Sequence, residues 1–152
     1  MKTYCLKNEL IKGINAVMPI TQTRNALPIL ANLLFKTEEN AIVISATDLE
    51  RAIICKIKGE IIEEGAITIS AKKFLKIIME FPSDKPIEIS SDKSSQININ
   101  IKSEKIKTKL TGIDASEYPA IPAFPTENSI SINKNTLISM LKKTVFSVSK
   151  DP

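Results

Sequence analysis

Three segments of the chain share one pattern of apolar and polar residues, and they begin at Thr3, Ala66 and Ser129. Each starts with an alternating run, as in a half-buried strand, and continues into apolar residues spaced three and four apart, as in an amphipathic helix. The apolar positions of the three helices superpose: Leu10, Ile11, Ile14 and Val17; Phe74, Leu75, Ile78 and Phe81; Leu137, Ile138, Leu141 and Thr144. The offsets, 64 residues from Leu10 to Phe74 and 63 from Phe74 to Leu137, indicate a structural repeat.

Alternating runs that suit strands also follow the first two helices, and polar residues typical of turns separate them. These runs occupy 28–36, 41–47 and 50–58 after the first helix, and 86–90, 96–102 and 105–111 after the second. The repeating unit is therefore one strand, one helix and three further strands. This pattern predicts an α+β fold in which two βαβββ units place their helices on one face of antiparallel sheets.

Residues 1–125 hold two copies of this unit, and we expect them to form one domain. Pro119, Pro122 and Pro125 predict an extended connector, which puts a domain boundary within 120–127. Residues 126–152 hold the strand and helix of a third copy, which then stops. Because such a unit cannot bury its own apolar face, we interpret the chain as part of a longer repeat protein, or as one deliberately trimmed.

The polar faces of the predicted helices carry mainly lysine and asparagine. Opposite the apolar stripes lie Asn8, Lys12 and Asn15 on the first helix, Lys72, Lys73 and Lys76 on the second, and Asn135, Ser139, Lys142 and Lys143 on the third. Helices aligned on one side of a sheet would present a shared positive surface. Such a surface binds the phosphates of duplex DNA weakly, without sequence preference and with a strong dependence on salt. The alternative is a protein-interaction domain whose lysine faces are only solvated.

The composition narrows the chemistry further. The net charge is +4, from 21 basic and 17 acidic residues, which is compatible with a nucleic-acid partner. The chain contains no histidine, which excludes catalysis and metal binding that depend on imidazole. Cys5 and Cys55 are expected to be reduced thiols of the core, and we expect no metal or cofactor. The sequence has no long apolar segment or signal peptide, so we expect a cytoplasmic protein without membrane contact.

One pair of carboxylates could be considered for catalysis. Asp48 and Glu50 lie two residues apart in the run SATDLER. Arg51 is adjacent, and no second acidic cluster accompanies the pair, which favours a role in a turn or salt bridge. No phosphate-binding glycine loop or nucleophile motif is found in the sequence, so we expect a non-enzymatic function.

Several stretches resemble the bacterial sliding clamp family, the beta subunits of DNA polymerase III. They are NELIKGINAV, TRNALPILANLLF, ISATDLE, ITISAKKFLKIIMEFP and GIDASEYPAIP, followed by NTLISMLKKTVFSVSKDP, which resembles the opening of the family's second domain. The resemblance is collinear and extends from Met1 to Pro152. It agrees with the repeat count, because the family builds each domain from two βαβββ units.

The resemblance implies a ring of two protomers, each with three similar domains. The sheets form the outer wall, and the helices surround duplex DNA, so that the ring tethers the DNA polymerase for processive synthesis. In this chain, the DNA-binding residues would be Lys12, Lys72, Lys73 and Lys76 on the helices and Arg24 in the loop after the first helix. The polymerase and the clamp loader would be partners of the full-length protein.

The resemblance also implies where the ring closes. The edge of the first domain would lie at 105–110, with Lys105, Lys107, Thr108 and Leu110 as candidate contacts of the homodimer. Thr108 stands where some relatives carry an aromatic residue. Members of the family are more than twice as long as this chain. The pocket for polymerase and clamp-loader peptides, which lies mainly between their second and third domains, is therefore expected to be absent.

Overall fold

The computed structural model describes residues 1–152 except 22–26, 40, 84, 93–97, 123–129 and 150–152. The chain divides into two compact units, unit 1 (1–121) and unit 2 (122–152). The expected boundary between 125 and 126 lies outside the described residues, so the assignment of domains stays a prediction. None of the helices in the described ranges is both long and apolar enough to cross a membrane.

Unit 1 is built from short strands and two α-helices. Its elements are β1 (Lys2–Leu6), α1 (Lys7–Thr21), the 3-10 helix η1 (Pro28–Ala31), β2 (Asn32–Glu38), β3 (Ala41–Thr47), β4 (Ala52–Ile57), β5 (Glu60–Glu63), β6 (Gly65–Ser70), α2 (Ala71–Glu80), β7 (Pro86–Ser91), β8 (Asn98–Ser103), β9 (Ile106–Thr111), β10 (Ile113–Asp114) and the 3-10 helix η2 (Ala115–Glu117). Unit 2 contains α3 (Lys134–Thr144) and the 3-10 helix η3 (Val145–Ser147).

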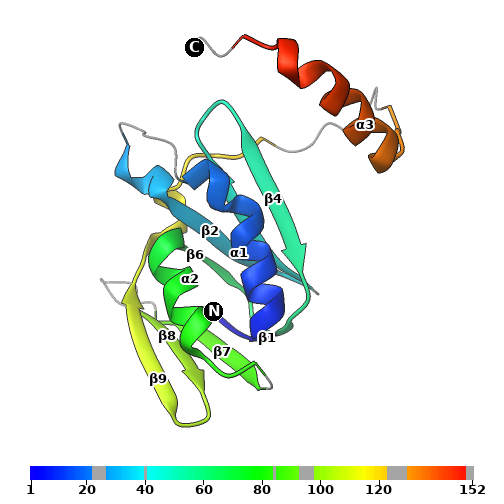
Figure 1. The fold of residues 1–152 in the computed structure, drawn as a ribbon. Helices are drawn as coiled ribbons and strands as arrows, with labels where there is room; N and C mark the ends of the chain where they lie inside the picture. The colour runs from blue at the N-terminus through cyan, green and yellow to red at the C-terminus, as the bar shows by residue number, and fades with distance from the viewer. Residues whose placement is uncertain (22–26, 40, 84, 93–97, 123–129, 150–152) are drawn as a thin grey trace. The chain divides into compact units, whose positions relative to one another are not determined.

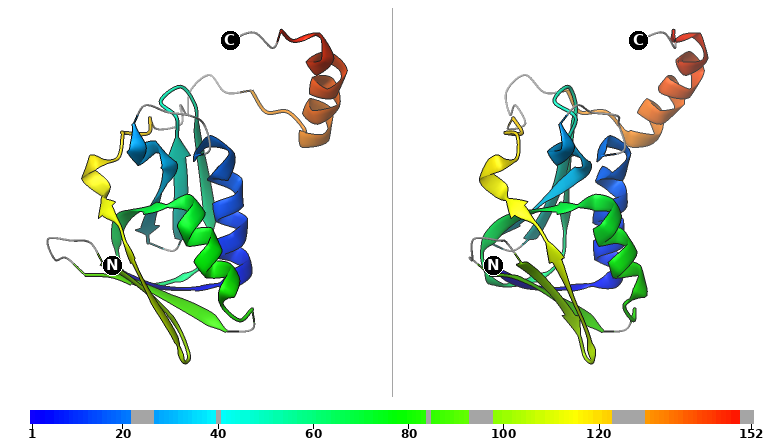
Figure 2. Two further views of the ribbon diagram at one scale, coloured as in Figure 1. Left: turned by 60° about the vertical axis from the view of Figure 1, so that its left-hand side comes forward. Right: turned by 90° about the vertical axis from the view of Figure 1, so that its left-hand side faces the viewer.

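The strands form two antiparallel five-stranded sheets, which confirms the predicted α+β class. Sheet A has the order β5-β1-β7-β8-β9, and sheet B has the order β10-β6-β2-β3-β4. The strand before each helix joins the sheet of the other repeat, since β1 pairs with β7 and β6 pairs with β2. The two repeats are therefore interlocked rather than placed one after the other. Figures 1 and 2 show α1 and α2 side by side against the sheets.

Several element bounds differ from the prediction. Residues 28–31 form η1 instead of the start of a strand, because Pro28 has no backbone N–H to pair with a neighbouring strand. The strand expected from residue 50 begins at Ala52, after a turn at 48–51. The strands β5 and β10 were not predicted. They are only four and two residues long, too short to show an alternating pattern.

The strand expected in the third repeat is described only at 130–133, and these residues lie outside any strand, although α3 follows as predicted. A strand needs a neighbouring strand for its backbone hydrogen bonds, and the described part of unit 2 contains no other strand. The apolar stripe predicted for this helix is also exposed at Leu137, Ile138 and Leu141.

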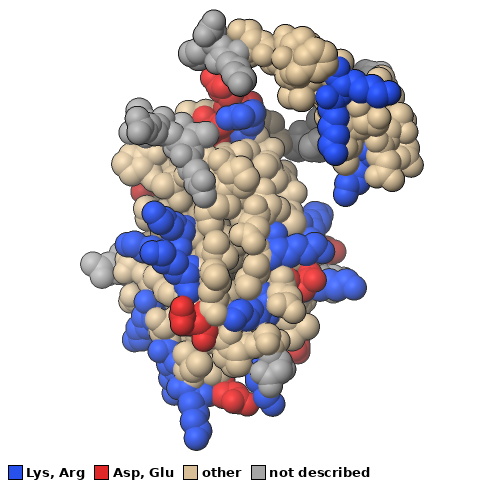
Figure 3. Space-filling model, in the orientation of Figure 1, with Lys and Arg blue, Asp and Glu red and all other residues tan. Residues whose placement is uncertain are grey.

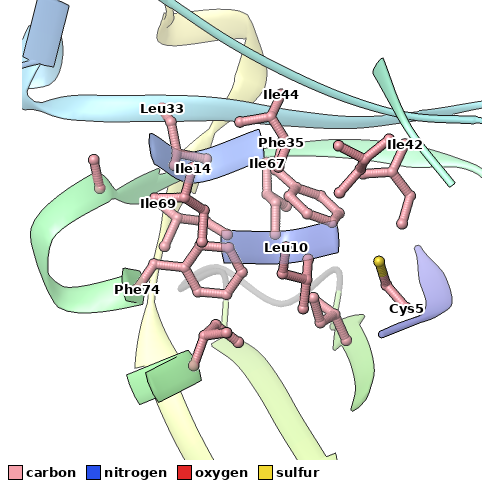
Figure 4. Packing of buried hydrophobic residues seen from close by; sticks show 14 of the residues in the cluster. Cys5, Leu10, Ile14, Leu33, Phe35, Ile42, Ile44, Ile67, Ile69 and Phe74 are labelled. Atoms are coloured by element: carbon pink, nitrogen blue, oxygen red, sulfur yellow. The ribbon is translucent and has the colours of Figure 1, made fainter. Parts of the chain in front are cut away.

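The predicted apolar stripes of the first two helices form the core of unit 1. Leu10, Ile14 and Val17 of α1 and Phe74 and Ile78 of α2 are fully buried, together with residues of both sheets. Figure 4 shows Phe35 of β2 facing Phe74, with ring centroids 6.0 Å apart and planes at 90°. Fully burying one such side chain contributes about 1.5–3 kcal/mol, so this shared core accounts for the docking of the helices.

Gly13 allows α1 to lie close to sheet B. A Cβ atom at this position would come 2.7 Å from Cδ1 of Ile44 on β3 and 3.0 Å from Cγ2 of Ile57 on β4. Those separations are shorter than ordinary van der Waals contact, so a larger residue would require either the two isoleucine side chains or the helix to shift. The glycine therefore allows close packing of α1 on β3 and β4.

The two cysteines are free thiols, as expected. Cys5 is buried in β1, and its Sγ lies 3.1 Å from the carbonyl oxygen of Lys58, to which it donates. Burial raises the pKa of the Cys5 thiol to about 12, so the unreactive protonated form predominates at neutral pH. Cys5 is thus a structural residue of the core.

Tyr118 fastens the end of unit 1 to sheet B. Its side chain is buried, and its hydroxyl donates to the carbonyl oxygen of Asn32 and accepts from the backbone N–H of Thr47, both at 3.2 Å. Burial raises the pKa of Tyr118, so the phenol remains protonated and able to donate. The tyrosine of the sequence run EYP thus hydrogen-bonds one backbone carbonyl of β2 and one backbone N–H of β3.

Replacing Tyr118 with phenylalanine tests this role. Tyr118→Phe keeps the ring but leaves the Thr47 N–H and the Asn32 carbonyl without their partner, and we expect a loss of about 1–3 kcal/mol in the free energy of unfolding. Urea denaturation measures this loss. Tyr4→Phe is the matched control, because Tyr4 is only partly buried and its partner Glu88 keeps ion pairs with Lys2 and Lys102. Equal losses in the two variants would contradict the proposed role of Tyr118.

Candidate nucleic-acid interface

The helix α1 presents a polar surface opposite its buried stripe. Asn8, Lys12 and Asn15 are exposed, as the sequence predicts. Glu9, at the edge of this surface, is partly buried and accepts a hydrogen bond of 3.4 Å from the backbone N–H of Lys58. Lys12 is therefore the one basic residue on the central exposed face of α1.

The helix α2 carries a denser group of positive charges. Lys72, Lys73 and Lys76 are exposed, while Phe74 and Ile78 on the opposite side are fully buried. Glu80 at the end of the helix is its only acidic residue. The structure records no ion pair for these three lysines within the described ranges. We call Lys72, Lys73 and Lys76 the α2 lysine cluster.

The exposed surfaces of the two helices adjoin each other. The helices are in contact, and Figure 1 shows them running in opposite directions, so that the start of α1 lies beside the end of α2. Figure 3, in the same orientation, shows Lys and Arg side chains on both sides of this face and few acidic ones between them. The structure thus brings Lys12 and the α2 lysine cluster to one side of unit 1.

Lys7 has a different role from these lysines. Its Nζ donates to the carbonyl oxygens of Met79 and Phe81, both at 2.6 Å, at the end of α2. These carbonyls carry the negative end of the helix dipole, which a lysine ammonium stabilises. Lys7 therefore ties the start of α1 to the end of α2. The sequence gives no sign of this contact, because the partners lie more than 70 positions away in the chain.

Arg24, the loop arginine predicted to contact DNA, lies outside the described residues. The helix α1 ends at Thr21, and the next described element, η1, begins at Pro28. Its assignment as a DNA contact therefore stays a prediction.

The candidate ring-closing residues lie on and beside β9, an edge strand of sheet A. The register pairs Thr108 with Ile101 and Leu110 with Ile99, both buried, so Thr108 and Leu110 share the face of the sheet that meets the core. Lys107 pairs with Lys102 on the opposite face, and Lys105 is exposed in the preceding turn. The four predicted residues are thus gathered at one edge but divided between two faces and a turn.

Comparison with known proteins identifies the family. Residues 1–122 match the family described as DNA polymerase III beta subunit, N-terminal domain. The chain belongs to this family. It is 34% identical over 150 residues to the beta sliding clamp of Vibrio cholerae, covering 97% of this chain and 40% of that protein. It is 32% identical over 149 residues to the beta sliding clamp of Vibrio harveyi, covering 97% of this chain and 100% of that relative.

Solved structures of sliding clamps share the fold. The C. crescentus beta sliding clamp superposes with a TM-score of 0.90 at 26% identity, over 99% of this chain and 40% of that one. The chain thus spans about two fifths of the length of the V. cholerae and C. crescentus clamps.

In this member of the sliding clamp family, the run SATDLER completes β3 and continues into a turn at 48–51. Oδ1 of Asp48 accepts from the backbone N–H groups of Arg51 (2.8 Å) and Glu50 (3.2 Å), and Oδ2 pairs with the Arg51 guanidinium at 2.6 Å. The backbone N–H of Arg51 and its guanidinium hold the pKa of Asp48 below its usual range. The Asp48 carboxylate is therefore ionised at neutral pH, and both of its oxygens are hydrogen-bonded within the turn. This confirms its predicted role in a turn and a salt bridge.

Lys7→Met tests the contact between the two helices in this sliding clamp domain. Methionine keeps the length and the helix propensity of lysine but cannot donate to the α2 carbonyls, so we expect the free energy of unfolding to fall by about 1–2 kcal/mol. Lys12→Met is the control, and its effect should stay within about 0.5 kcal/mol because Lys12 is exposed. Thermal and urea denaturation measure both. A Lys7 variant as stable as the wild type would exclude the helix-tying role.

Proposed function

We propose that this chain forms the N-terminal part of a DNA sliding clamp, a non-catalytic ring that encircles duplex DNA and tethers the replicative polymerase in the cytoplasm. Membership of the beta subunit family supports the proposal. The observation that carries it is the shared exposed face of α1 and α2, where Lys12 and the α2 lysine cluster meet few opposing charges.

The chemistry of this face suits a ring that slides. Lysine ammonium groups on flexible stems attract phosphates as point charges and do not fix one register on the duplex. A protein that encloses DNA needs no tight contact with it, and weak contacts allow movement along the helix. The exposed basic residues of α1 and α2 are lysines, which favours a mobile inner wall over a site that binds one sequence tightly.

The proposal includes partners of the complete protein. The DNA polymerase and a clamp loader would bind the full-length ring, and two protomers would form it. We propose that the β9 edge, with Lys105, Lys107, Thr108 and Leu110, is one of the surfaces that close this homodimer. The unpaired backbone groups of an edge strand support this, because they can pair with a strand of another protomer.

Binding to linear duplex DNA tests the DNA-facing surface. We expect the 152-residue chain to bind with a dissociation constant of about 10⁻⁶–10⁻⁴ M near physiological salt, independent of sequence, and to lose affinity steeply as salt rises. Reversing the charges at Lys12, Lys72 and Lys76 to glutamate should abolish this binding in fluorescence anisotropy.

The control for that experiment reverses three exposed lysines on β2, on β4 and directly after β4. Lys36, Lys56 and Lys58 are exposed, and Lys36 and Lys56 alternate with residues that face the core. Their reversal changes the net charge equally and should weaken binding much less. If both variants bind alike, the lysine faces are only solvated, which favours the alternative of a protein-interaction domain. Nanomolar binding by the wild-type chain would contradict a passive inner wall.

The ring-closing edge has its own test. Ile106 lies on the same face of β9 as Thr108 and Leu110, and its side chain is 42% exposed. In a complete clamp that carries this chain, Ile106→Asp should raise the dissociation constant of the dimer at least about 10-fold, because a carboxylate would be buried in the interface. Sedimentation equilibrium measures the change. Ile54→Asp, at an equally exposed isoleucine of β4, is the control. An unchanged dimer with Ile106→Asp would remove β9 from the interface.

A further inference from the structure

The positive charges of the α2 lysine cluster are unfavourably placed on their own helix. Lys72 and Lys73 occupy the first turn of α2, at the positive end of the helix dipole, and the first turn contains no acidic residue. Lys76 follows at spacings of four and three residues, so it faces both other lysines along one side of the helix. Like charges at these spacings destabilise a helix.

The other helices carry fewer unfavourable charges. α1 and α3 each begin at a lysine, Lys7 and Lys134, but the first turn of α1 also contains Glu9, and the last turn of α3 contains Lys142 and Lys143, which the dipole favours. On α1, moreover, the exposed neighbours of Lys12 are the neutral Asn8 and Asn15, and the ammonium of Lys7 is occupied by the α2 carbonyls. The unfavourable charges are therefore concentrated on α2.

No ion pair within the described residues offsets the charge repulsion on α2. The structure gives the α2 lysine cluster no ion pair in the described part of the chain, whereas Lys2, Lys36, Lys85 and Lys102 each pair with a glutamate. All three members are exposed, and the buried residues of α2 are apolar. Residues that break a local rule without a structural compensation are typical of functional surfaces.

We propose that α2 is the principal phosphate-contacting element of this domain, and that its lysine cluster is retained for DNA at the expense of fold stability. The inference rests on the proposed function and goes beyond it by assigning most of the phosphate contacts to α2 rather than to α1. The phosphates of the duplex supply the negative charge that α2 lacks. Lys12 on α1 adds a single weaker contact, and its exposed neighbours are neutral asparagines. The exposed face of α1 thus contributes little charge to DNA binding.

Two measurements on three variants of the 152-residue chain test this assignment. The variants are K72Q/K73Q/K76Q, K12Q, and the control K36Q/K56Q/K58Q, which removes as much charge as the triple variant from exposed positions outside α1 and α2. Glutamine has nearly the helix propensity of lysine, so the substitutions change charge rather than helix formation. The first measurement is the slope of log affinity for linear duplex DNA against log salt. The second is the melting temperature without DNA.

We expect K72Q/K73Q/K76Q to weaken DNA binding but to raise the melting temperature of the free chain. K72Q/K73Q/K76Q should reduce the salt slope by about 3 and K12Q by about 1, since each phosphate contact contributes about 0.9. Without DNA and at low salt, K72Q/K73Q/K76Q should melt about 2–5 °C above the wild type. This gain should shrink near 1 M salt, where the Debye length is about 3 Å. The control should not raise the melting temperature.

The outcomes separate this inference from the proposed function. A lower melting temperature for K72Q/K73Q/K76Q would overturn the inference, because the cluster would then stabilise the fold. If K12Q reduces the slope of log affinity against log salt as much as the triple variant does, α2 is not the principal phosphate-contacting element. The proposal that this face binds DNA would be unaffected. A wild-type chain that shows no salt-dependent binding to duplex DNA would overturn the proposed function itself, and this inference with it.

Discussion

The apolar stripes of α1 and α2 pack against the inner faces of both sheets, where Phe74 of α2 meets Phe35 of β2 edge to face. Each helix has one buried side, so the opposite side must face outward. Because the helices also contact each other, their outward sides form one continuous face. The lysines on that face are thus brought together by the burial of leucine, isoleucine and phenylalanine, without any attraction between the lysines themselves.

The exchange of strands between the repeats makes this arrangement rigid. β1 is held in sheet A by β7, and β6 is held in sheet B by β2, so each helix is joined at its start to the sheet of the other repeat. Lys7 adds a polar link between the two helices, and Tyr118 fastens the end of unit 1 to β2 and β3. Neither repeat can move away from the other without breaking backbone pairing. The helix face therefore keeps its shape although its charges repel each other.

The sequence pattern predicted the helices, most strands, the buried stripes and the lysine faces, because each depends on the local spacing of apolar residues. It could not predict the strand exchange, since the apolar pattern of β1 is the same whichever strand it pairs with. It also missed the contacts of Lys7 and Tyr118, whose partners are backbone groups more than 70 positions away. Repeat spacing is a local signal, whereas pairing and hydrogen bonding over such distances depend on the complete fold.

The strand predicted in unit 2 also shows that a local pattern alone does not determine strand pairing. Its alternating pattern resembles that of β1, yet residues 130–133 form no strand, and the apolar stripe of α3 is exposed. In unit 1, each leading strand is stabilised by the sheet of the other repeat, so an alternating pattern becomes a strand only when that sheet is present. The repeat is therefore a unit of sequence, while the unit of folding is a pair of repeats that exchange strands.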